Sequence, residues 1–235
     1  MAQAAKSLEE MGYRYLAVGG LVPLRPAAIH ECLKAIRSRV NPDTRLHLLG
    51  FAKAEHIEEF VQYDISSFDS TSPLIRAFKD ARANYYLEHP SGGLEYFAAI
   101  RVPQAMENPR LMQATKRGVL NAEETQRLES RALSALRRFA ESKLPLDETL
   151  EQLMAYQRLL AVASSDREDV REKEIAKARS LVRSTLEARP WQRCQCAICR
   201  TIGVEVIIFR SSNRNKRRGF HNLGVYYEHL KRTLA

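Results

Sequence analysis

Three cysteines and one histidine are the residues of this sequence whose types and spacing most directly predict chemistry. Cys194, Cys196 and Cys199 lie within six residues, and His221 follows 22 positions after the last of them. Thiolates and a neutral imidazole are ligands that Zn²⁺ prefers, and four of them close a tetrahedral structural site. A disulfide between Cys194 and Cys196 would be strained, and an odd number of thiols favours a metal over a disulfide set. The sequence therefore predicts a zinc site, with a reduced or redox-active cluster as the alternative.

A second histidine, His229, competes for the fourth ligand position. His221 is favoured because Gly219 can turn the chain just before it, whereas His229 lies about two turns further along the helix expected there. With all four positions filled by protein, no position is left for a water that the metal would activate. We therefore expect Zn²⁺ to be a structural cofactor.

A basic segment adjoins the predicted zinc site. The chain has 37 Lys and Arg against 28 Asp and Glu, a net charge of +9, and residues 193–218 alone carry seven basic side chains and one acid. Such a patch predicts contact with a polyanion, in the first place nucleic acid, although a solvated basic surface is the alternative. The candidate nucleic-acid contacts are Arg76, Arg210, Arg214, Lys216, Arg217 and Arg218.

The composition is that of a globular protein, with 45% hydrophobic and 28% charged residues. No apolar run approaches the ~20 residues needed to cross a bilayer, and the first ten residues lack the apolar core of a signal peptide. Cys32 is the one cysteine outside the cluster, so there is no disulfide framework. These features predict a cytoplasmic protein with no membrane partner.

The elements that must position these residues alternate between helix and strand near the N-terminus. Strands are expected over 13–18, 46–49 and 65–68, separated by helices over 26–40 and 54–63. This alternation predicts parallel strands in an α/β sheet or barrel. The first strand is mostly apolar and is therefore expected to be buried on both faces. Each strand ends in glycine or aspartate, at the end where such architectures place their chemistry.

The rest of the chain follows a different pattern. A strand is expected over 94–102, and only helices over 104–189. The branched residues of 204–209 predict a further strand. A basic loop over 211–219 and a closing helix over 220–234 complete the expected elements.

The cysteine spacing, followed after a strand by His221-Asn222-Leu223, resembles the C-terminal zinc subdomain of the tRNA-guanine transglycosylases. The earlier strand ends are similar in the same order. Gly19-Gly20 resembles the glycine pair of the family's base pocket. Leu49-Gly50 resembles the end of the next strand, where an apolar residue packs on the purine. Phe68-Asp69 resembles the motif that carries the nucleophilic aspartate.

The long helical stretch between Asp69 and the cysteines, with Arg217-Arg218-Gly219-Phe220-His221, is more similar to the DNA-modifying branch, the DpdA-type DNA 7-deazaguanine transglycosylases, than to the tRNA enzymes. The resemblance implies an α/β fold, a partial TIM-type (β/α) barrel comprising its last three strand–helix units. It also implies a helical insertion and a C-terminal zinc-binding subdomain. The corresponding domains are 1–84, 85–189 and 190–235.

The resemblance also implies the reaction, exchange of guanine for a preQ0-like 7-deazaguanine base in DNA. Asp69 would be the nucleophile that forms a covalent bond to the sugar. Without the resemblance, an aspartate after a strand is more often a helix N-cap. The residues expected to contact the base are Gly19, Gly20, Leu49 and Gly50. The alternatives are a zinc-stabilised nucleic-acid-binding fragment without activity and a relative that acts on tRNA.

An eight-stranded barrel needs about 250 residues, and this sequence offers three barrel-like strand–helix steps. The first five strands of the family's barrel are missing, and with them its acid–base aspartate and the side chains that read the purine. We therefore expect a missing N-terminal barrel half as partner, in the same chain or a separate one, and no activity from this polypeptide alone. Such a partial barrel can arise from a truncated chain, a misplaced start, a split gene or a remnant retained only for binding. The tRNA relatives also suggest a homodimer.

Overall fold

The computed structural model describes residues 1–51, 57–210 and 212–233, and the chain divides into two compact units. The first unit comprises Met1–Pro73, Pro90–Leu94 and Tyr226–Ala235. The second unit comprises Leu74–His89 and Glu95–Val225. This division differs from the three consecutive domains expected from the sequence, which stay a prediction.

The first unit is built on a three-stranded parallel sheet. Its strands are β1 (Tyr15–Val18), β2 (Arg45–Leu48) and β3 (Ile65–Phe68), in the spatial order β1-β2-β3. The parallel α/β arrangement expected from the alternating helices and strands is therefore confirmed. A bulge between β2 and β3 places Ser67 opposite His47, which brings two polar side chains to one face of the sheet.

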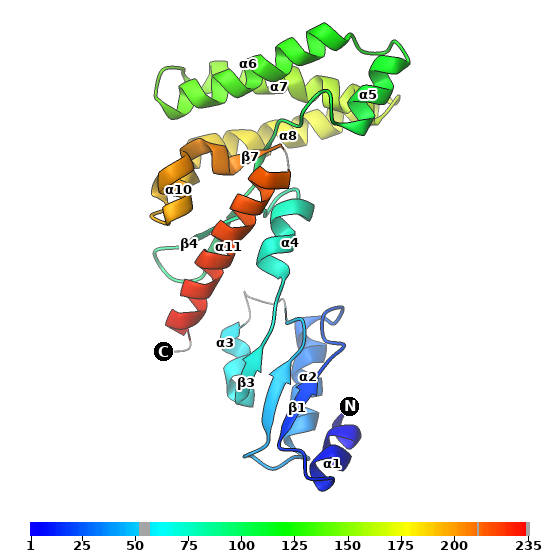
Figure 1. Ribbon diagram of the computed structural model, residues 1–235, viewed down its shortest axis with the longest axis vertical. Coiled ribbons are helices and arrows are strands. Elements are labelled where there is room, and N and C mark those ends of the chain that lie inside the picture. Colours follow the sequence, from blue (N-terminus) through cyan, green and yellow to red (C-terminus); the bar gives the residue numbers. More distant parts are fainter. Residues whose placement is uncertain (52–56, 211, 234–235) are drawn as a thin grey trace. The chain divides into compact units, whose positions relative to one another are not determined.

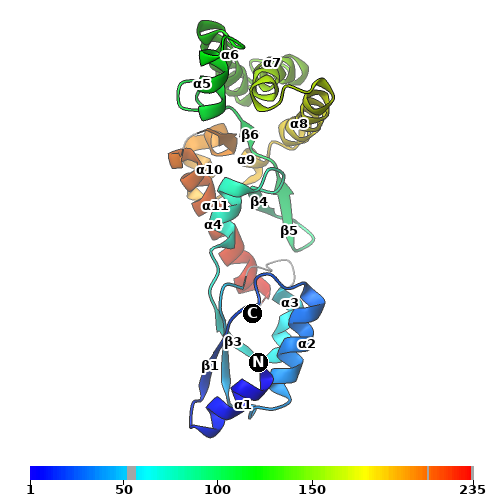
Figure 2. The same ribbon diagram turned by 90° about the vertical axis from the view of Figure 1, so that its right-hand side faces the viewer.

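Helices cover the other face of this sheet. They are α1 (Ala2–Glu10), α2 (Pro26–Arg37) and α3 (Ile57–Phe60), followed by the 3₁₀ turn η2 (Val61–Tyr63). Figure 2 shows α2 and α3 on one side of the strands. The first part of the expected helix over 54–63 lies outside the described residues. The buried side chains that join α2 to the sheet are Ile29, Leu33, Ile36, Leu16, Val18, Leu46 and Leu48.

The first strand is not buried on both faces, contrary to the sequence prediction. Leu16 and Val18 face the helices and are buried, whereas Tyr15 is 46% exposed and Ala17 is also exposed. The reason is that the helices of the unit pack on one side of the sheet only. Apolar character along a short strand does not distinguish this arrangement from burial between two layers.

The second unit contains two small sheets and a helical block. β4 (Tyr85–Glu88) pairs with β5 (Leu94–Phe97), and β6 (Ile100–Arg101) pairs in parallel with β7 (Ile208–Phe209). The strand expected over 94–102 is thus divided between β5 and β6. The helix α4 (Ser72–Lys79) precedes β4.

The helix-only prediction for 104–189 is confirmed. The helices are α5 (Pro109–Lys116), α6 (Ala122–Ala140), α7 (Leu146–Ser164) and α8 (Glu168–Ala188). Figure 1 shows α6 beside α7, with α8 next to them. The α6–α7–α8 block and the zinc-ligand region share one buried apolar cluster. None of the described helices combines the length and the apolar character needed to cross a lipid bilayer.

The strand predicted over 204–209 is wrong for most of its length. After the short helices α9 (Pro190–Arg193) and α10 (Ala197–Ile202), the chain forms a 3₁₀ segment, η3 (Gly203–Ile207). Only Ile208 and Phe209 are extended, because their partner strand β6 is itself two residues long. Strand preference reflects the fit of branched side chains to a half-buried surface, and here η3 buries the same side chains without a ladder.

The basic loop predicted over 211–219 is also wrong, because α11 (Ser212–Thr233) begins at Ser212 and continues through this stretch. Gly219 is part of the helix. A Cβ atom there would lie 3.2 Å from Leu74 Cδ2, so glycine permits close packing against α4 instead of turning the chain.

Candidate functional site

The predicted zinc ligands converge in the second unit. The Sγ atoms of Cys194, Cys196 and Cys199 and Nδ1 of His221 all lie within 4.8 Å of one another. The three S···N distances are 3.7, 3.3 and 3.4 Å. Zn–S and Zn–N bonds of about 2.3 and 2.0 Å in a tetrahedron require S···N separations of about 3.5 Å. The four residues therefore fit one Zn²⁺, which would cross-link residues 194–199 to α11.

His221 is held in the orientation and tautomer that a metal ligand requires. Its Nε2–H donates to the carbonyl oxygen of Tyr86 at 2.7 Å, which leaves Nδ1 free of a proton and directed at the thiols. The ring also stacks on Tyr85, with ring centroids 4.1 Å apart. Burial, followed by the charge of Cys199, raises the pKa of Tyr85 far above its usual range. The Tyr85 hydroxyl thus remains a donor to Cys199 Sγ at 3.2 Å.

The local folding of the chain explains how these ligands meet. Cys196 is the N-cap of α10, where its sulfur accepts from the backbone N–H of Cys199. Beside His221, the Asn222 side chain accepts from Tyr86 N–H and donates to the Asn84 carbonyl. The His221-Asn222 pair therefore fastens α11 to β4, which sets the height of the imidazole relative to the thiols.

The choice of His221 over His229 is supported by this geometry, because the clustered ligand atoms belong to His221. One of the two reasons given for this choice was wrong, since Gly219 lies within α11 and does not turn the chain before His221. The two histidines are eight residues apart on this helix, or about two turns, which is roughly 12 Å along the axis. One helix therefore presents only one of the two histidines to the cysteine cluster.

Asp69 lies at the C-terminal end of β3 in the first unit, and its side chain is 57% exposed. Its Oδ1 accepts hydrogen bonds from the Gly50 backbone N–H at 2.9 Å and from His47 Nε2 at 3.3 Å. Both partners belong to β2 or the residues directly after it. The carboxylate is thus fixed by its contacts with the neighbouring strand, at the end of the sheet where parallel α/β architectures carry their reactive groups.

This environment keeps Asp69 ionised. The hydrogen bond from Gly50 N–H lowers the pKa of the carboxyl below its usual range, and the hydrogen bond and charge of His47 act in the same direction. A carboxylate must be deprotonated to attack an electrophilic carbon, so the arrangement favours a nucleophile over a general acid.

The residues expected to contact a base lie at the same end of the sheet. Leu49 N–H continues the ladder by donating to the Val18 carbonyl, and the Leu49 side chain is exposed. A Cβ atom on Gly19 would lie 3.6 Å from Leu49 Cδ1, so these two residues adjoin. Gly20 and Gly50 adopt positive φ angles of 75° and 65°, which favour glycine. The structure therefore brings Gly19, Leu49, Gly50 and Asp69 to one edge.

The sequence reasoning missed a polar chain that leads to Asp69. His47 Nδ1 lies 2.6 Å from Ser67 Oγ, and Ser67 also shares a hydrogen bond with the Tyr15 hydroxyl. A carboxylate only accepts, so His47 donates through Nε2. In the neutral imidazole Nδ1 then accepts from the Ser67 hydroxyl, whose oxygen accepts from Tyr15. The available signal was His47 itself, the lone polar residue between Leu46 and Leu48.

Arg218, one of the predicted nucleic-acid contacts, is fully buried. Its guanidinium donates to the carbonyls of Ala77, Val206 and Ile208 and to the Asn215 side chain. The inward direction follows from the helical turn of α11, which a loop prediction could not anticipate. This residue therefore ties the end of η3 to α4 and α11, and it is withdrawn from the nucleic-acid candidates.

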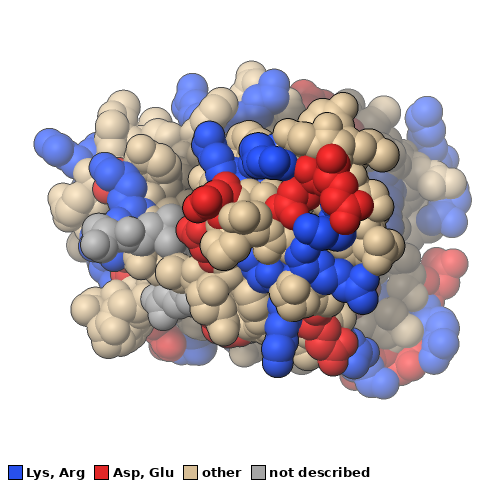
Figure 3. Space-filling view, turned by 90° about the horizontal axis from the view of Figure 1, so that it is seen from below, with Lys and Arg blue, Asp and Glu red and all other residues tan. Residues whose placement is uncertain are grey.

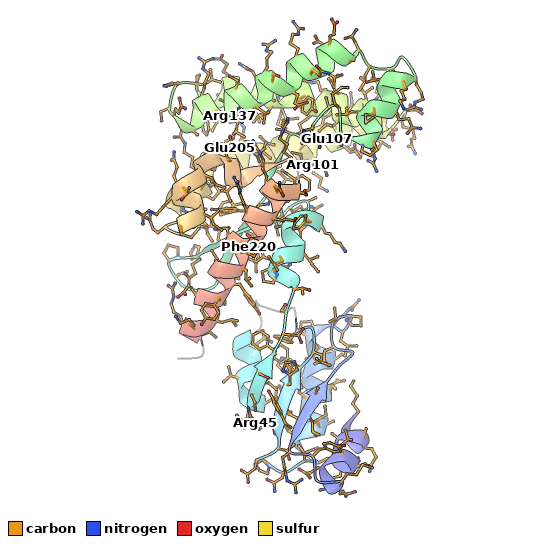
Figure 4. The ribbon with its side chains drawn as sticks, viewed as in Figure 1. Arg45, Arg101, Glu107, Arg137, Glu205 and Phe220 are labelled. Carbon is orange, nitrogen blue, oxygen red and sulfur yellow. The ribbon has the colours of Figure 1, made fainter. Side chains whose placement is uncertain are left out.

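Three of the seven basic side chains of residues 193–218 form ion pairs with acids of the second unit, the first being Arg193 with Glu95. Arg210 forms an ion pair with Glu129, and Arg214 forms one with Glu205. Lys216 and Arg217 are exposed on α11. Arg137 also pairs with Glu205 (both are labelled in Figure 4). Arg76 lies over the ring of Tyr96 at 5.7 Å. The exposed part of the predicted patch is thus smaller than its sequence charge indicates.

Figure 3 shows one face of the molecule, on which basic and acidic side chains are interspersed. A face of mixed charge attracts a polyanion less strongly than a face that carries charge of one sign.

Comparison with known proteins identifies a relative of this chain. No family model matches the sequence. A DNA-guanine transglycosylase of Salmonella montevideo is 42% identical over 233 residues, which cover 99% of this chain and 53% of the relative. The chain thus spans about half the length of the curated relative that it matches. This likeness confirms the resemblance drawn from the motifs: over the part that it spans, the chain is a homologue of a DNA-type member of the transglycosylase superfamily.

Proposed function

We propose that the chain is the nucleophile-bearing part of an enzyme that exchanges guanine in DNA for a 7-deazaguanine base. The observation that carries this proposal is the ionised Asp69 carboxylate, held by Gly50 and His47 at the C-terminal edge of a parallel sheet. The name of the Salmonella relative, a DNA-guanine transglycosylase, supports DNA as the substrate. Zinc, held by the Cys194–Cys196–Cys199–His221 cluster, would stabilise the second unit.

The proposed reaction has two displacements at the same carbon. An Asp69 oxygen attacks C1′ of the deoxyribose, the C1′–N9 bond breaks, and its electron pair leaves with guanine N9, which takes up a proton. The 7-deazaguanine N9 then loses its proton and attacks C1′, and Asp69 departs as a carboxylate. The target base must first leave the helical stack, because C1′ is otherwise inaccessible to the carboxylate.

Each residue at the sheet edge has a role in this proposal. Gly19 and Gly20 allow the backbone to approach the flat edge of the base, since no Cβ intervenes. The exposed side chain of Leu49 offers an apolar surface to the ring. His47, steadied through Ser67 and Tyr15, positions the Asp69 carboxylate.

The open face of the sheet supports the proposal that this unit is the last three strand–helix steps of a (β/α)₈ barrel. In such a barrel, helices cover the outside and alternate strand residues fill the inside. Here α2 and the other helices cover one face, and Tyr15, Ala17, Arg45 and His47 lie on the other. The proposed partner is the remaining part of the barrel, which would supply the acid–base group and the side chains that read the purine.

The test uses DNA containing guanine and a radiolabelled 7-deazaguanine. The chain is combined with a separate polypeptide comprising the part of the Salmonella relative that it does not match. We expect label in DNA and a protein–DNA adduct with Asp69, and neither with Asp69→Asn. Asp64→Asn, at the other end of β3 and also exposed, is the matched control and should retain activity.

Two outcomes would contradict the proposal. Full activity of Asp69→Asn would show that Asp69 is not the nucleophile. Label in tRNA but not in DNA would favour a relative that acts on tRNA. The chain without its partner should incorporate no label, so exchange by the isolated polypeptide would contradict the need for a complete barrel.

A further inference from the structure

A recess of about 250 Å³ lies in the second unit, and none of the four predicted zinc ligands lines it. Its walls come from the end of β6, the start of α5 and the facing sides of α7 and α8. The volume is just below the ~300 Å³ at which small-molecule sites begin. The recess is therefore large enough for the base or the sugar of a nucleotide, and it opens to solvent.

Three cations line this recess, Arg101, Arg110 and Lys177 (Arg101 is labelled in Figure 4). Arg101 and Arg110 line the same recess, and burial, followed by the positive charge of Arg110, lowers the pKa of Arg101, whereas the charge of Glu174 raises it. Glu174 is the acid of the lining, and its carboxylate accepts from the Ser164 hydroxyl at 2.8 Å.

Neither Arg101 nor Arg110 has a carboxylate within ion-pair distance among the described residues. Arg179 and Arg183 of the same helical block, by contrast, form ion pairs with Glu151 and Asp147. The two guanidinium groups of Arg101 and Arg110 repel each other, and the negative charge of Glu174 offsets the effect of Arg110 on Arg101 only in part. An anion between them relieves this repulsion and gains charge-assisted hydrogen bonds.

The floor of the recess is apolar, which narrows the ligand further. It is formed by the small and branched side chains Ala98, Ala99, Leu160, Ala161 and Val182. The Arg101 guanidinium also lies over the ring of Phe209, 5.2 Å from its centroid. A planar guanidinium that stacks on one side can stack on a second planar ring on the other. The site thus combines an anion-binding rim with surfaces for a flat, weakly polar body.

We propose that this recess binds a nucleoside phosphate unit, with the phosphate on Arg101, Arg110 and Lys177 and the base or sugar on the apolar floor. The unit is either a free mononucleotide or one nucleotide of a DNA strand. The proposal does not depend on base exchange at Asp69. It assigns a role to the helical block, which the catalytic scheme leaves without one.

The test measures the affinity of the full chain for dGMP by calorimetry. Arg101→Gln and Arg110→Gln should each weaken dGMP binding at least tenfold, because each removes one half of the anion clamp. Arg117→Gln, an exposed arginine at the other end of α5, and Lys173→Gln, an exposed lysine on α8, are matched controls and should stay within twofold. Tryptophan fluorescence of each variant verifies that the second unit is folded.

Further ligands distinguish the source of the nucleotide. Inorganic phosphate and deoxyguanosine alone should each bind at least tenfold more weakly than dGMP if rim and floor act together. A labelled single-stranded oligonucleotide that loses affinity in the same variants, with a smaller salt dependence, identifies a strand as the occupant. Loss of dGMP binding with unchanged oligonucleotide binding identifies a free nucleotide.

The proposal is overturned if dGMP fails to bind the native chain at millimolar concentration, or if the two arginine variants bind it as well as the native chain does. Asp69→Asn should leave dGMP binding unchanged. Failure of base exchange and failure of this site are therefore separate results.

Discussion

In the second unit, Arg218, His221 and Asn222 are buried, and hydrogen bonds connect each of them to backbone carbonyls. In the first unit, Asp69 and Tyr15 are exposed, and the polar chain that joins them runs along an open sheet face. Buried polar groups that are satisfied internally fix a fold, because leaving one unpaired costs about 1–3 kcal/mol. Exposed polar groups that are ordered but can still form further hydrogen bonds are suited to binding a ligand.

The polar groups of the two units are therefore suited to different roles, stability in the second unit and ligand binding in the first. We expect the proposed zinc site and the buried arginine to stabilise the second unit, so that their loss is measured as unfolding. We expect the residues around Asp69 to contribute little to stability. Substitutions there should change the rate of the reaction and not the free energy of unfolding. The predictions below test this contrast.

The largest effect is expected from loss of the metal. A strong chelator, or Cys199→Ser, should unfold the second unit, because structural Zn²⁺ binds with apparent free energies of about 10–16 kcal/mol in small zinc domains. Trp191, the sole tryptophan, is buried next to Cys194, so its fluorescence should shift to the red. Metal analysis should find one zinc per native chain. Cys32→Ser, outside the cluster, should change neither measurement, and a native spectrum after complete metal removal would contradict the structural role.

A smaller loss of stability is expected from Arg218→Met, which leaves the Ala77, Val206 and Ile208 carbonyls without their donor. The free energy of unfolding of the second unit should fall by about 2–4 kcal/mol. Arg217→Met, one residue earlier and exposed, should change it by less than about 0.5 kcal/mol. Urea titration followed by Trp191 fluorescence measures both. Should Arg218→Met weaken DNA binding without changing stability, the assignment of Arg218 as structural would be wrong.

Acid should weaken the first unit through Glu9. Hydrogen bonds from the Thr44 hydroxyl, then from Asn41 N–H and Lys6, lower the pKa of Glu9 to about 2. A carboxyl whose pKa is depressed on folding contributes stability above its ordinary pKa of about 4.5 and loses it as the pH falls towards 2. Native protein should therefore be more stable than Glu9→Gln at pH 7, and the two should converge near pH 2. Hydrogen exchange of the β2 amides reports on this unit, and a pH-independent difference would contradict the linkage.

The smallest effect is expected from His47→Phe, which removes one of the hydrogen bonds to Asp69. One such bond is worth about 1 kcal/mol, so the rate of adduct formation should fall roughly fivefold. The pKa of Asp69 should rise towards its ordinary value, so the acidic limb of the pH–rate profile should move to higher pH. Stability should be unchanged. A fivefold slower reaction with an unshifted profile would mean that His47 acts on geometry alone.

Local signals were sufficient for several features of the fold and the site. The ligand types and spacing of Cys194, Cys196 and Cys199 required only a short stretch of chain, since nearby residues must share a small volume. The three parallel strands followed from alternating helix and strand patterns, and the strand ends identified Gly50 and Asp69 as neighbours at one edge.

Long-range contacts decided the rest. The register between β2 and β3, with its bulge, brought His47 to Ser67 and Asp69, and no local pattern specifies a register. The helical turn of α11 determined that Arg217 is exposed and Arg218 buried. Ion pairs with Glu129 and Glu205 formed at Arg210 and Arg214, two of the predicted nucleic-acid contacts. Sequence by itself therefore determined which chemical groups are present and which strands carry them. Only the tertiary structure decided which of those groups meet water and which meet each other, because burial and pairing depend on residues far apart in the chain.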